Sequence, residues 1–488
     1  MKEKTNDKVY DVAVIGAGVT GTAISRVLSR YELDCAVLEK EADVSFGVSK
    51  ANSGIIHAGF HHAADTLKAR LEIKGNRMFD ELRHELNFPF ERCGILVAAF
   101  NPEEMRIVEQ LYGRGKENRV LGIELCGRER ILSLEPKLNG DVIGGLYAPT
   151  GGIIEPYRYA FALMESAQEN GVDYKTNFEV IRSSKTGEGG FVIESRTLEK
   201  IRCRWAVNAA GLYADEVSAI MGGEEFEIVP RKGEEYLLDR NASCHTGPVV
   251  FPVPGKSSKG MLVIPTVEGT TMAGPTAMEI RDKEDTSTSS DNFHTIFGSA
   301  RRLVPVLSEK DLITSFAGLR PVLAGNDFYI GVSSTEPRLV QVAGIQSPGL
   351  TASPAIADYV KDLLRSAGLT LKEKKQYKAE LNGIKRLRDM TPGEIGSSIA
   401  DDPAYGEIVC RCENVSEAEI IQAIHKGHRT VDGIKFYTRA GMGRCQGGFC
   451  SHRILKILAR ETGSDVLEIN KKGSGAEIVS ARMRGGHE

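Results

Sequence analysis

The sequence predicts an α/β fold made of a parallel-sheet domain, an antiparallel-sheet domain interleaved with it, and a small helical domain at the C-terminal end. Three observations support this prediction. A β-branched run over 10–15 leads directly into a glycine-rich turn, whereas the segments 80–150 and 225–320 alternate polar and apolar residues between turn signals. Four cysteines then cluster between residues 410 and 450. A chain of 488 residues is long enough for two or three domains.

The charge of the chain is close to balanced. Its 62 basic and 66 acidic residues leave a net charge of −4, which argues against bulk attraction to nucleic acid or to an anionic membrane. Residues 1–8 are charged rather than apolar, and no run approaches the roughly 18 apolar residues of a membrane-spanning helix. We therefore expect a cytoplasmic protein, with membrane contact at most peripheral, at the inner membrane through partners.

The N-terminal segment has the pattern of a βαβ unit. The strand at 10–15 is followed by Gly16-Ala-Gly18-Val-Thr-Gly21, a helical stretch, and a second apolar run that ends at Glu39. In such a unit Gly16 permits the tight turn, Gly18 lets a pyrophosphate approach the backbone, and Gly21 permits close packing of helix and strand. Glu39 can accept hydrogen bonds from adenosine ribose hydroxyls. The alternative is a glycine-rich loop that serves only packing, and the strand, helix and acidic residue argue against it.

A loop of small residues over 46–59 follows this unit, without helical or strand periodicity. Such a loop can wrap around an extended cofactor, with hydroxyl and amide groups at the pyrophosphate and His57 near a ring system. The glycine motif by itself leaves FAD and NAD open. No second GxGxxG follows a strand, so we do not expect this chain to bind NAD itself.

Three later motifs extend the pattern. They are 205–214, a strand that ends in small residues, 316–321, which places Arg320 in a turn before a strand, and 344–351, which precedes an apolar helix over 355–364. The amides of the last motif would form a helix N-terminus suited to an electron-rich ring edge or a developing anion.

Over roughly residues 8–365, these motifs resemble the FAD-dependent oxidoreductases of the glycine oxidase, L-2-hydroxyglutarate oxidase and respiratory glycerol-3-phosphate dehydrogenase group. The resemblance implies a Rossmann-like domain that binds FAD. The residues expected to contact FAD are Gly16, Gly18, Gly21, Glu39, Lys40, Ser49, Asn52, Ser53, Gly211, Gly349, Leu350 and Thr351.

The cysteine cluster consists of two close pairs, Cys410-Arg-Cys412 and Cys445-Gln-Gly-Gly-Phe-Cys450. Two such pairs, separated by a helical stretch, can close around one small metal centre, and the neighbouring glycines let backbone N–H groups approach cluster sulfurs. Zinc takes the same tetrahedral thiolate set, so spacing alone leaves both metals open. The other five cysteines, at 35, 93, 126, 203 and 244, are scattered and odd in number, which argues against a disulfide framework.

The residues around these cysteines resemble the [2Fe-2S] domain of the bacterioferritin-associated ferredoxin family, in the version appended to flavin dehydrogenases. This resemblance implies that Cys410, Cys412, Cys445 and Cys450 hold a [2Fe-2S] cluster. The expected segments are an FAD-binding domain over 8–80, 145–225 and 320–365, a substrate or cap domain over 81–144 and 226–319, a linker over 366–404, the [2Fe-2S] domain over 405–465 and a loose tail over 466–488.

The two ends of the chain together predict a reaction. A flavin accepts two electrons as a hydride, whereas a [2Fe-2S] cluster carries one, so we expect oxidation of an organic substrate and transfer of single electrons to a partner protein or subunit. His57 is the first candidate for the base that takes the hydroxyl proton, with His61 and His62 behind it; the alternative role is orienting the flavin. Arg320 suits bidentate binding of a carboxylate or phosphate, and its alternative is a surface ion pair.

A further candidate anion site lies in the segment 229–236. Arg231 and Lys232 would bind an anion if this segment reaches the active site, and would be solvated if it forms a surface turn. The sequence leaves both interpretations open.

The substrate implied by the resemblance is a small anionic secondary alcohol. The joined flavin and cluster domains are most similar to the anaerobic glycerol-3-phosphate dehydrogenase family, so we expect oxidation of sn-glycerol 3-phosphate to dihydroxyacetone phosphate. That family usually has Arg-Tyr where this chain has His61-His62, and segments 51–59 and 67–70 are nearer the L-2-hydroxyglutarate oxidase pattern. L-2-hydroxyglutarate, or another 2-hydroxy acid, is therefore the alternative substrate. A third interpretation is an electron-transfer or redox-sensing module without a small alcohol substrate.

Overall fold

The computed structural model describes residues 5–255 and 260–482. The chain divides into two compact units, one of residues 1–40 with 44–381 and the other of residues 41–43 with 382–488. Of the charged N-terminal segment, residues 1–4 lie outside the described residues, as do residues 483–488 of the expected tail.

The first sheet of unit 1 has eight strands, with the order β10-β11-β12-β1-β2-β9 and with β20 and β19 continuing from β12. The central pairs β1–β2, β1–β12, β2–β9 and β12–β20 are parallel. Val12, Ala13 and Val14 are fully buried, as expected of a central strand in a parallel sheet that is covered on both faces. The strands are β1 (Thr5–Ile15), β2 (Cys35–Leu38), β9 (Asp173–Lys175), β10 (Val180–Lys185), β11 (Phe191–Ser195), β12 (Lys200–Asn208), β19 (Tyr329–Val332) and β20 (Leu339–Ala343).

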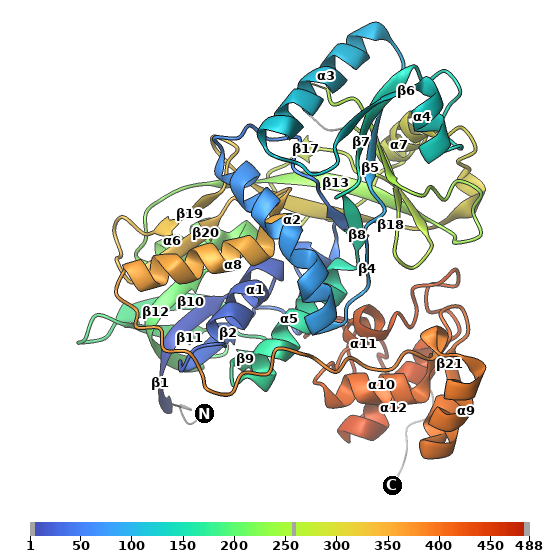
Figure 1. Cartoon of the computed structure of the whole chain (residues 1–488). Coiled ribbons are helices and arrows are strands. Elements are labelled where there is room, and N and C mark those ends of the chain that lie inside the picture. Colours follow the sequence, from blue (N-terminus) through green and yellow to red (C-terminus); the bar gives the residue numbers. More distant parts are fainter. Residues whose placement is uncertain (1–4, 256–259, 483–488) are drawn as a thin grey trace. The chain divides into compact units, whose positions relative to one another are not determined.

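A group of helices packs with this sheet, and Figure 1 shows α1, α2, α5 and α8 side by side. Their bounds are α1 (Val19–Leu28), α2 (Leu67–Leu86), α5 (Pro156–Glu169) and α8 (Gly349–Ser366), while α6 (Ala214–Met221) packs against β10 and β20. Helices α2 and α8 approach closely at Gly75, where an added Cβ would lie 2.1 Å from the carbonyl oxygen of Thr351. This contact fixes the start of α8 against α2.

The second sheet of unit 1 has nine strands in the order β17-β13-β16-β15-β14-β5-β7-β6, with β18 paired to β13. It is antiparallel, as predicted, except for the pair β5–β14, which is parallel. The strands are β5 (Ile95–Ala99), β6 (Glu124–Gly127), β7 (Gly144–Ala148), β13 (Ile228–Leu238), β14 (Val249–Pro252), β15 (Leu262–Pro265), β16 (Thr271–Gly274), β17 (Met278–Glu279) and β18 (Leu312–Leu323). A separate small sheet joins β3 (Ile55–Ile56), β8 (Gly152–Ile154) and β4 (Phe90–Glu91).

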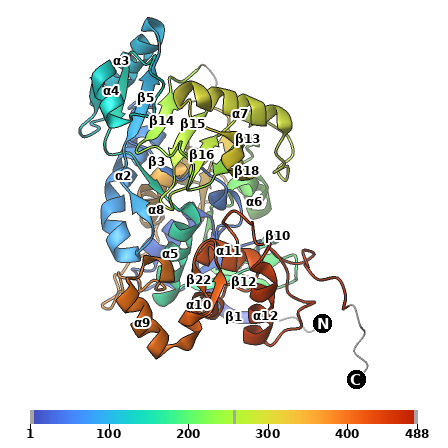
Figure 2. The same cartoon turned by 90° about the vertical axis from the view of Figure 1, so that its right-hand side faces the viewer.

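An apolar cluster covers each face of the second sheet around its central strands. Leu96 and Ala98 of β5 belong to one apolar cluster, whereas their neighbours Ile95 and Val97 belong to another, because side chains alternate along a strand. Helix α7 (Ser290–Leu303) covers the first cluster, beside β14 to β16 in Figure 2, together with α4 (Arg128–Leu134). Helix α3 (Pro102–Glu117) covers the second.

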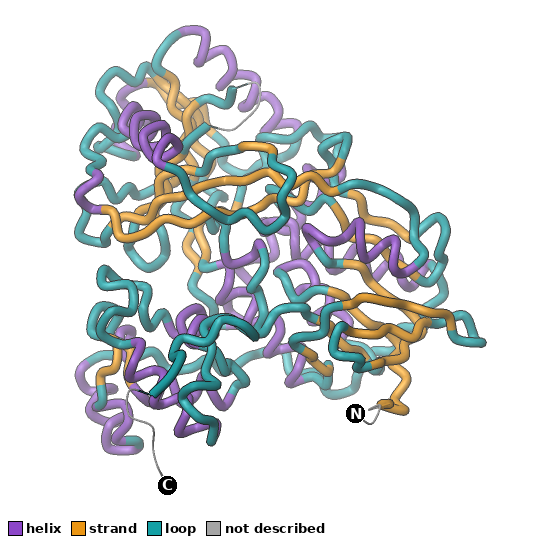
Figure 3. Tube along the Cα trace, turned by 180° about the vertical axis from the view of Figure 1, so that it is seen from behind, coloured by secondary structure: helices purple, strands orange, loops and turns teal. Residues whose placement is uncertain are grey.

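Unit 2 consists mainly of helices, drawn in purple in Figure 3. Its elements are α9 (Pro392–Asp401), β21 (Ile408–Cys410), β22 (Val415–Ser416), α10 (Glu417–His425), α11 (Val431–Thr438) and α12 (Ser451–Thr462). Helix α9 lies inside the segment 366–404, for which the sequence predicts a linker. Short 3₁₀ helices complete both units at Val48–Lys50, Gly211–Tyr213, Glu309–Asp311, Leu387–Asp389 and Pro403–Gly406. None of the described helices combines the length and apolar character needed to cross a membrane.

Candidate functional site

The predicted glycine turn lies between β1 and α1. Gly16 has a φ of 105°, and an added Cβ there would lie 2.5 Å from the carbonyl oxygen of Ala209. A Cβ on Gly21 would lie 1.9 Å from the carbonyl oxygen of Gly16. Gly18 is the N-cap residue of α1 and has no side chain that could accept a hydrogen bond from the helix. The N–H of Val19 donates instead to Ser49 Oγ over 2.9 Å. The first turn of α1 is therefore held at the carboxyl end of β1, with its amide groups near the backbone of the turn.

The carboxyl ends of the neighbouring strands bring further predicted residues to this edge of the sheet. Glu39 follows β2, is 7% exposed, and accepts a hydrogen bond of 2.6 Å from the N–H of Ala17. The ammonium of Lys40 lies 3.8 Å from the centre of the Tyr213 ring. Gly211 follows β12 with a φ of 58°, and no atom lies within 4 Å of the position of an added Cβ. These residues thus occupy the edge at which an adenosine is expected in a βαβ domain.

The loop over 46–59 is held by its own side chains and by the second sheet. Asn52 donates to the carbonyl oxygen of Ser49 and accepts from the N–H of Gly54 over 2.8 Å. The hydroxyl of Ser53 donates to the carboxylate of Glu235 on β13. The structure thus gives the side chains of Asn52 and Ser53 partners within the protein, and their predicted contacts with a cofactor remain a prediction.

His57 follows β3 and is 7% exposed. Its backbone N–H donates to Thr351 Oγ1 over 2.9 Å, and its carbonyl oxygen accepts from the side chain of Asn76 over 2.8 Å. The Nε2 atom of its ring lies 3.1 Å from the Oγ atom of Ser347, just before α8. Gly349, Leu350 and Thr351 form the first turn of α8. The structure therefore brings the candidate base and the motif over 344–351 together.

His61 lies beside His57, with 5.9 Å between the ring centres. The ring centre of His61 also lies 5.4 Å from that of Phe251 on β14. The backbone here is fixed by α3 and the residue that follows it, because Arg114 donates to the carbonyl oxygen of His61 over 2.7 Å and Asn118 to that of His62 over 2.9 Å. His61 therefore borders the ring of His57 directly, whereas His62 is held through its backbone carbonyl group.

Arg320 lies within β18 and not in a turn, which corrects the local expectation from the sequence. Its guanidinium lies over Gly233 of β13, where an added Cβ would be 2.5 Å from Nη2. Nη1 donates to the carbonyl oxygen of Thr276 over 3.2 Å, and among the described residues Arg320 forms no ion pair. Burial lowers the pKa of Arg320, and the nearby carboxylate of Glu235 opposes this effect. The guanidinium thus has N–H groups available for an anion.

Arg231 and Lys232, on β13, are already paired with carboxylates. Arg231 donates to Glu279 over 2.8 Å, and Lys232 donates to Asp285 over 2.8 Å. These two residues point to opposite faces of the strand, because side chains alternate along it. The structure therefore gives both cations acidic partners within the second sheet and its connections.

Sequence reasoning missed Glu235, which lies on the same face of β13 as Arg231 and Gly233. It is 2% exposed, and burial raises the pKa of its carboxyl group, whereas Ser53 and Arg320 lower it. The alternation of residues along 229–236 would have placed Glu235 on the same face as Arg231, but its electrostatic interaction with Arg320 depends on the pairing of β13 with β18.

The four clustered cysteines form two pairs in unit 2. The Sγ atoms of Cys412 and Cys445 are 3.7 Å apart. The thiol of Cys450 donates to Cys410 and, with backbone N–H groups, lowers the pKa of Cys410 to about 6. Gly443 is required next to them, because an added Cβ would lie 2.3 Å from Cys412 Cβ. Among the described residues, no group of three or more His, Cys, Asp or Glu side chains is placed to hold a metal ion.

Comparisons with known proteins match both units. Residues 11–363 match the family model described as FAD dependent oxidoreductase, and residues 408–460 match that of the BFD-like [2Fe-2S] binding domain. The chain is 42% identical, over 97% of its length and 98% of the relative, to a glycerol 3-phosphate dehydrogenase of Caloramator mitchellensis. It is 27% identical, over 72% of its length and 90% of the relative, to a mitochondrial L-2-hydroxyglutarate dehydrogenase of Nematostella vectensis.

A solved structure is also similar. It is that of the dithionite-reduced L-alpha-glycerophosphate oxidase from Mycoplasma pneumoniae with FAD bound, which is 32% identical to this chain. The TM-score is 0.74, and the match covers 78% of this chain and 100% of that one.

Proposed function

Because the chain belongs to the FAD-dependent oxidoreductase family, we propose that it oxidises sn-glycerol 3-phosphate to dihydroxyacetone phosphate and passes the electrons through its [2Fe-2S] domain to a partner. The observation that carries the proposal is the guanidinium of Arg320, which lies half-buried on β18 and forms no ion pair with a described residue. Such a group is suited to a phosphate monoester. A relative that is similar over 97% of this chain is named glycerol 3-phosphate dehydrogenase.

FAD and the [2Fe-2S] cluster are the cofactors of these two domains. The turn at Gly16 and Gly21 fits FAD, because a side chain at either position would collide with the backbone that forms the cradle. Bound FAD takes up two electrons as a hydride from an alcohol, and the cluster carries one electron at a time. The residues that would hold FAD are Gly16, Gly18, Gly21 and Glu39 at its dinucleotide part and Gly349, Leu350 and Thr351 at its ring, while Cys410, Cys412, Cys445 and Cys450 would hold the cluster.

Replacing Gly21 by alanine is expected to remove most of the bound flavin. The new Cβ would lie 1.9 Å from the carbonyl oxygen of Gly16, so α1 and the turn would have to separate. The ratio of flavin to protein absorbance after purification measures this. Gly127→Ala is the matched control, since Gly127 also precedes a helix, α4, its φ is −72° and no atom lies within 4 Å of the added Cβ. Full flavin content in Gly21→Ala would contradict the assigned cradle.

The residues around His57 and Arg320 would share the work on the substrate. Arg320 would bind the phosphate group through the N–H groups that the protein leaves available. His57 would take the proton of the secondary hydroxyl, because Ser347 and Thr351 hold it in place at the start of α8. Phe251, fully buried beside the rings of His57 and His61, would help to exclude water.

Replacing Arg320 by lysine is expected to raise the half-saturating concentration of glycerol 3-phosphate by one to two orders of magnitude, since a lost bidentate charged contact costs about 1.5 to 3 kcal/mol. The measurement is anaerobic bleaching of the flavin at increasing substrate concentration. Arg231→Lys is the matched control, because Arg231 lies opposite Arg320 in the strand pair and is bound to Glu279. Unchanged saturation in Arg320→Lys would remove Arg320 from the substrate site.

L-2-hydroxyglutarate is the second candidate substrate, and the pair His61-His62 together with the relatives of that name favours it. Anaerobic bleaching with glycerol 3-phosphate and with a panel of 2-hydroxy acids separates the two candidates. Bleaching by a 2-hydroxy acid alone would replace the proposed substrate. No bleaching by any alcohol would favour an electron-transfer module.

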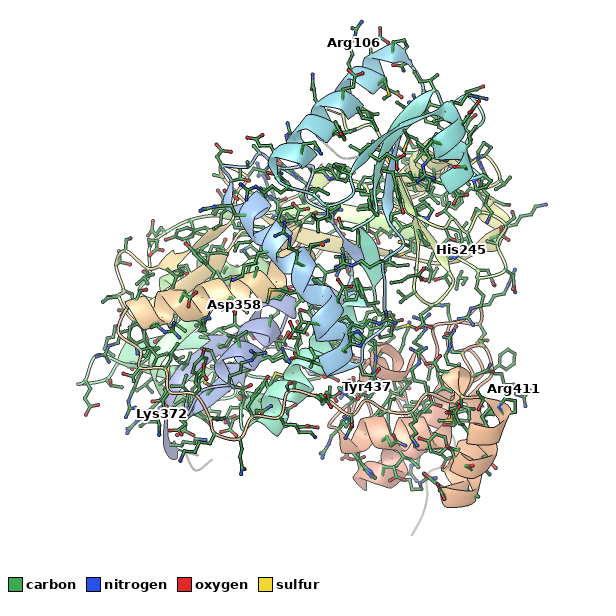
Figure 4. All side chains as sticks on the ribbon, in the orientation of Figure 1. Arg106, His245, Asp358, Lys372, Arg411 and Tyr437 are labelled. Carbon is green, nitrogen blue, oxygen red and sulfur yellow. The ribbon has the colours of Figure 1, made fainter. Side chains whose placement is uncertain are left out.

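The electron-accepting partner would approach unit 2 near the exposed cysteine. Cys412 is exposed, and Phe449, next to Cys450 in the chain, has 81% of its surface exposed. Arg411 is also exposed and extends outward from unit 2 in Figure 4. An exposed aromatic ring and a cation beside the cluster ligands support transfer of single electrons to another protein.

A further inference from the structure

One face of the strand pair β13–β18 carries the anion site. Arg231, Gly233 and Glu235 share this face of β13, because alternate residues of a strand point to the same side. They are paired across the ladder with Arg320, Gly318 and Phe316 of β18, respectively. The two strands therefore present three charged side chains, those of Arg231, Glu235 and Arg320, around two glycines.

The two glycines make room for groups from elsewhere. The guanidinium of Arg320 lies over Gly233, with Nη1 2.7 Å and Nη2 2.5 Å from the position of an added Cβ. The carbonyl oxygen of Ala51 lies over Gly318, only 1.9 Å from such a position. The guanidinium is thus next to Glu235, the following residue on this face, and the loop over 51–54 packs beside both.

Glu235 is buried, and only one of its two carboxyl oxygens has a hydrogen-bond partner among the described residues. It is 2% exposed, Oε1 accepts from the hydroxyl of Ser53, and Oε2 has no hydrogen-bond partner among the described residues. Arg320 acts on it through space, without a direct ion pair. A buried carboxylate oxygen that lacks a partner is costly, which makes it a group awaiting a ligand or a proton.

The surroundings of Glu235 contain little else that is charged. Gly274 at the end of β16 approaches its Cγ, with 3.2 Å to the position of an added Cβ. The charge of Arg231, on its own strand, is shared with Glu279. The groups that face Glu235 are Ser53 from the loop, Arg320 and Phe316 from β18, Gly274 from β16, and Gly233 and Arg231 from β13. Arg320 is the charged group that influences its titration.

We propose that Glu235 couples anion binding to proton uptake: when the anionic group of the substrate binds Arg320, the Oε2 atom of Glu235 takes a proton from solvent and donates it in a hydrogen bond to that anion. This inference rests on the proposed function, since it concerns the same anion site. An ionised carboxylate beside the incoming anion would repel it in a buried space, whereas a neutral carboxyl group can donate to it. The step forms the O–H bond of the carboxyl group and breaks an O–H bond of a solvent hydronium ion or of a buffer acid, and no electrons are transferred.

Anion binding is expected to weaken as the pH rises. Burial raises the pKa of Glu235, so its neutral form persists to a higher pH than that of an exposed glutamate. The anion binds this neutral form, so the affinity is complete below the pKa of Glu235 in the free enzyme and falls as the pH rises through it. For one linked proton, the dissociation constant increases about tenfold per pH unit above that point.

The test uses the oxidised holoenzyme and sulfate, a dianion whose own protonation does not change in the pH range of the stable protein. Isothermal titration calorimetry in buffers of different ionisation enthalpy counts the protons taken up with each sulfate. The wild-type protein is expected to take up about one proton per sulfate above the pKa of Glu235. Glu235→Gln is expected to bind sulfate without proton uptake and with a dissociation constant that does not change with pH.

Two further variants make the result specific. Glu279→Gln, which removes an exposed carboxylate near the same strands, is expected to keep the proton uptake of the wild type. Ser53→Ala removes a hydrogen bond that lowers the pKa of Glu235, so its pH profile is expected to move to higher pH. This shift keeps the proposal testable if Glu235→Gln loses its flavin.

Proton uptake that persists in Glu235→Gln would overturn the proposal, and so would sulfate binding that Arg320→Lys does not weaken. These outcomes are independent of the substrate assignment. A protein that shows the expected sulfate linkage but is not reduced by glycerol 3-phosphate would retain the role of Glu235 and lose the proposed function.

Discussion

Replacing His57 by asparagine is expected to slow the anaerobic bleaching of the flavin by glycerol 3-phosphate about 10²- to 10⁴-fold, the usual contribution of a general base. Asparagine cannot take the hydroxyl proton, and it is too short to replace the hydrogen bond of 3.1 Å between Nε2 of the histidine and Ser347. The half-saturating concentration of substrate should stay unchanged, because Arg320 supplies the binding contact. Stopped-flow absorbance at saturating substrate measures the rate.

The alternative role of His57, orienting the flavin, predicts a different result. If the ring only positions the cofactor, His57→Asn would shift the flavin spectrum or lower the flavin content, and the slower rate would follow from that loss. His61→Asn is the matched control, since its ring lies 5.9 Å from that of His57. Equal losses in both variants, or a wild-type rate in His57→Asn, would remove His57 as the base.

The βαβ unit and its edge residues can be predicted from the sequence, because nearby backbone atoms leave no space for a side chain at Gly16 and Gly21. The close approach of Gly21 to the carbonyl oxygen of Gly16 involves one turn and the helix that follows it. A few consecutive residues are therefore enough to predict this geometry. The position of His57 beside Thr351 is harder to predict, because it requires the small sheet and α8 to meet.

The sequence predicts the start of α8 several residues too late. Pro354 suggests that the helix begins after it, yet α8 begins at Gly349 and contains Pro354. A proline within a helix leaves the carbonyl oxygen of residue i−4 without its N–H partner. Here that residue is Leu350, and the hydroxyl of Ser353 donates to its carbonyl oxygen over 2.9 Å. The local replacement of one hydrogen bond thus lets the helix start at the residues predicted to contact the flavin.

Arg320 is expected in a turn because Pro321 follows it. In the structure Pro321 lies opposite Pro230 within the β13–β18 ladder. Proline has no backbone N–H, so two prolines that face each other remove hydrogen-bond donors at only one position of the strand pair. The register that brings them together depends on residues far apart in the sequence. The same register puts Arg320 on the face of the strand pair that also carries Glu235, which explains why the sequence indicates the cation and not the carboxylate.

The segment expected as a linker contains residues that start a helix but are also common in turns. Thr391-Pro-Gly-Glu394 begins α9, where Thr391 and Glu394 form a capping box. Serine or threonine followed three residues later by glutamate is a recognised start of a helix, and proline is favoured in its first turn. The signal for α9 is therefore local and present in the sequence, within the segment 366–404 that is expected as a linker.

Replacing Cys445 by serine is expected to leave bleaching of the flavin by substrate unchanged and to abolish the passage of electrons to the cluster. Four thiolates hold a [2Fe-2S] cluster, and a serine at one position removes one of them. Cys445 is chosen because it is only half-buried, whereas Cys410 and Cys450 are each 1% exposed and belong to the packed interior of unit 2. The electron paramagnetic resonance spectrum of the substrate-reduced protein measures the effect.

In the wild-type protein the substrate should produce the signal of a reduced [2Fe-2S] cluster, and in Cys445→Ser this signal should be absent, together with much of the iron and acid-labile sulfide. Cys93→Ser is the matched control, because Cys93 is also half-buried but lies in unit 1. A full cluster signal in Cys445→Ser would show that this thiolate is not a ligand. Slower flavin bleaching in the same variant would mean that the cluster supports the oxidation itself, contrary to a division of labour in which unit 1 oxidises the alcohol and unit 2 only carries electrons away.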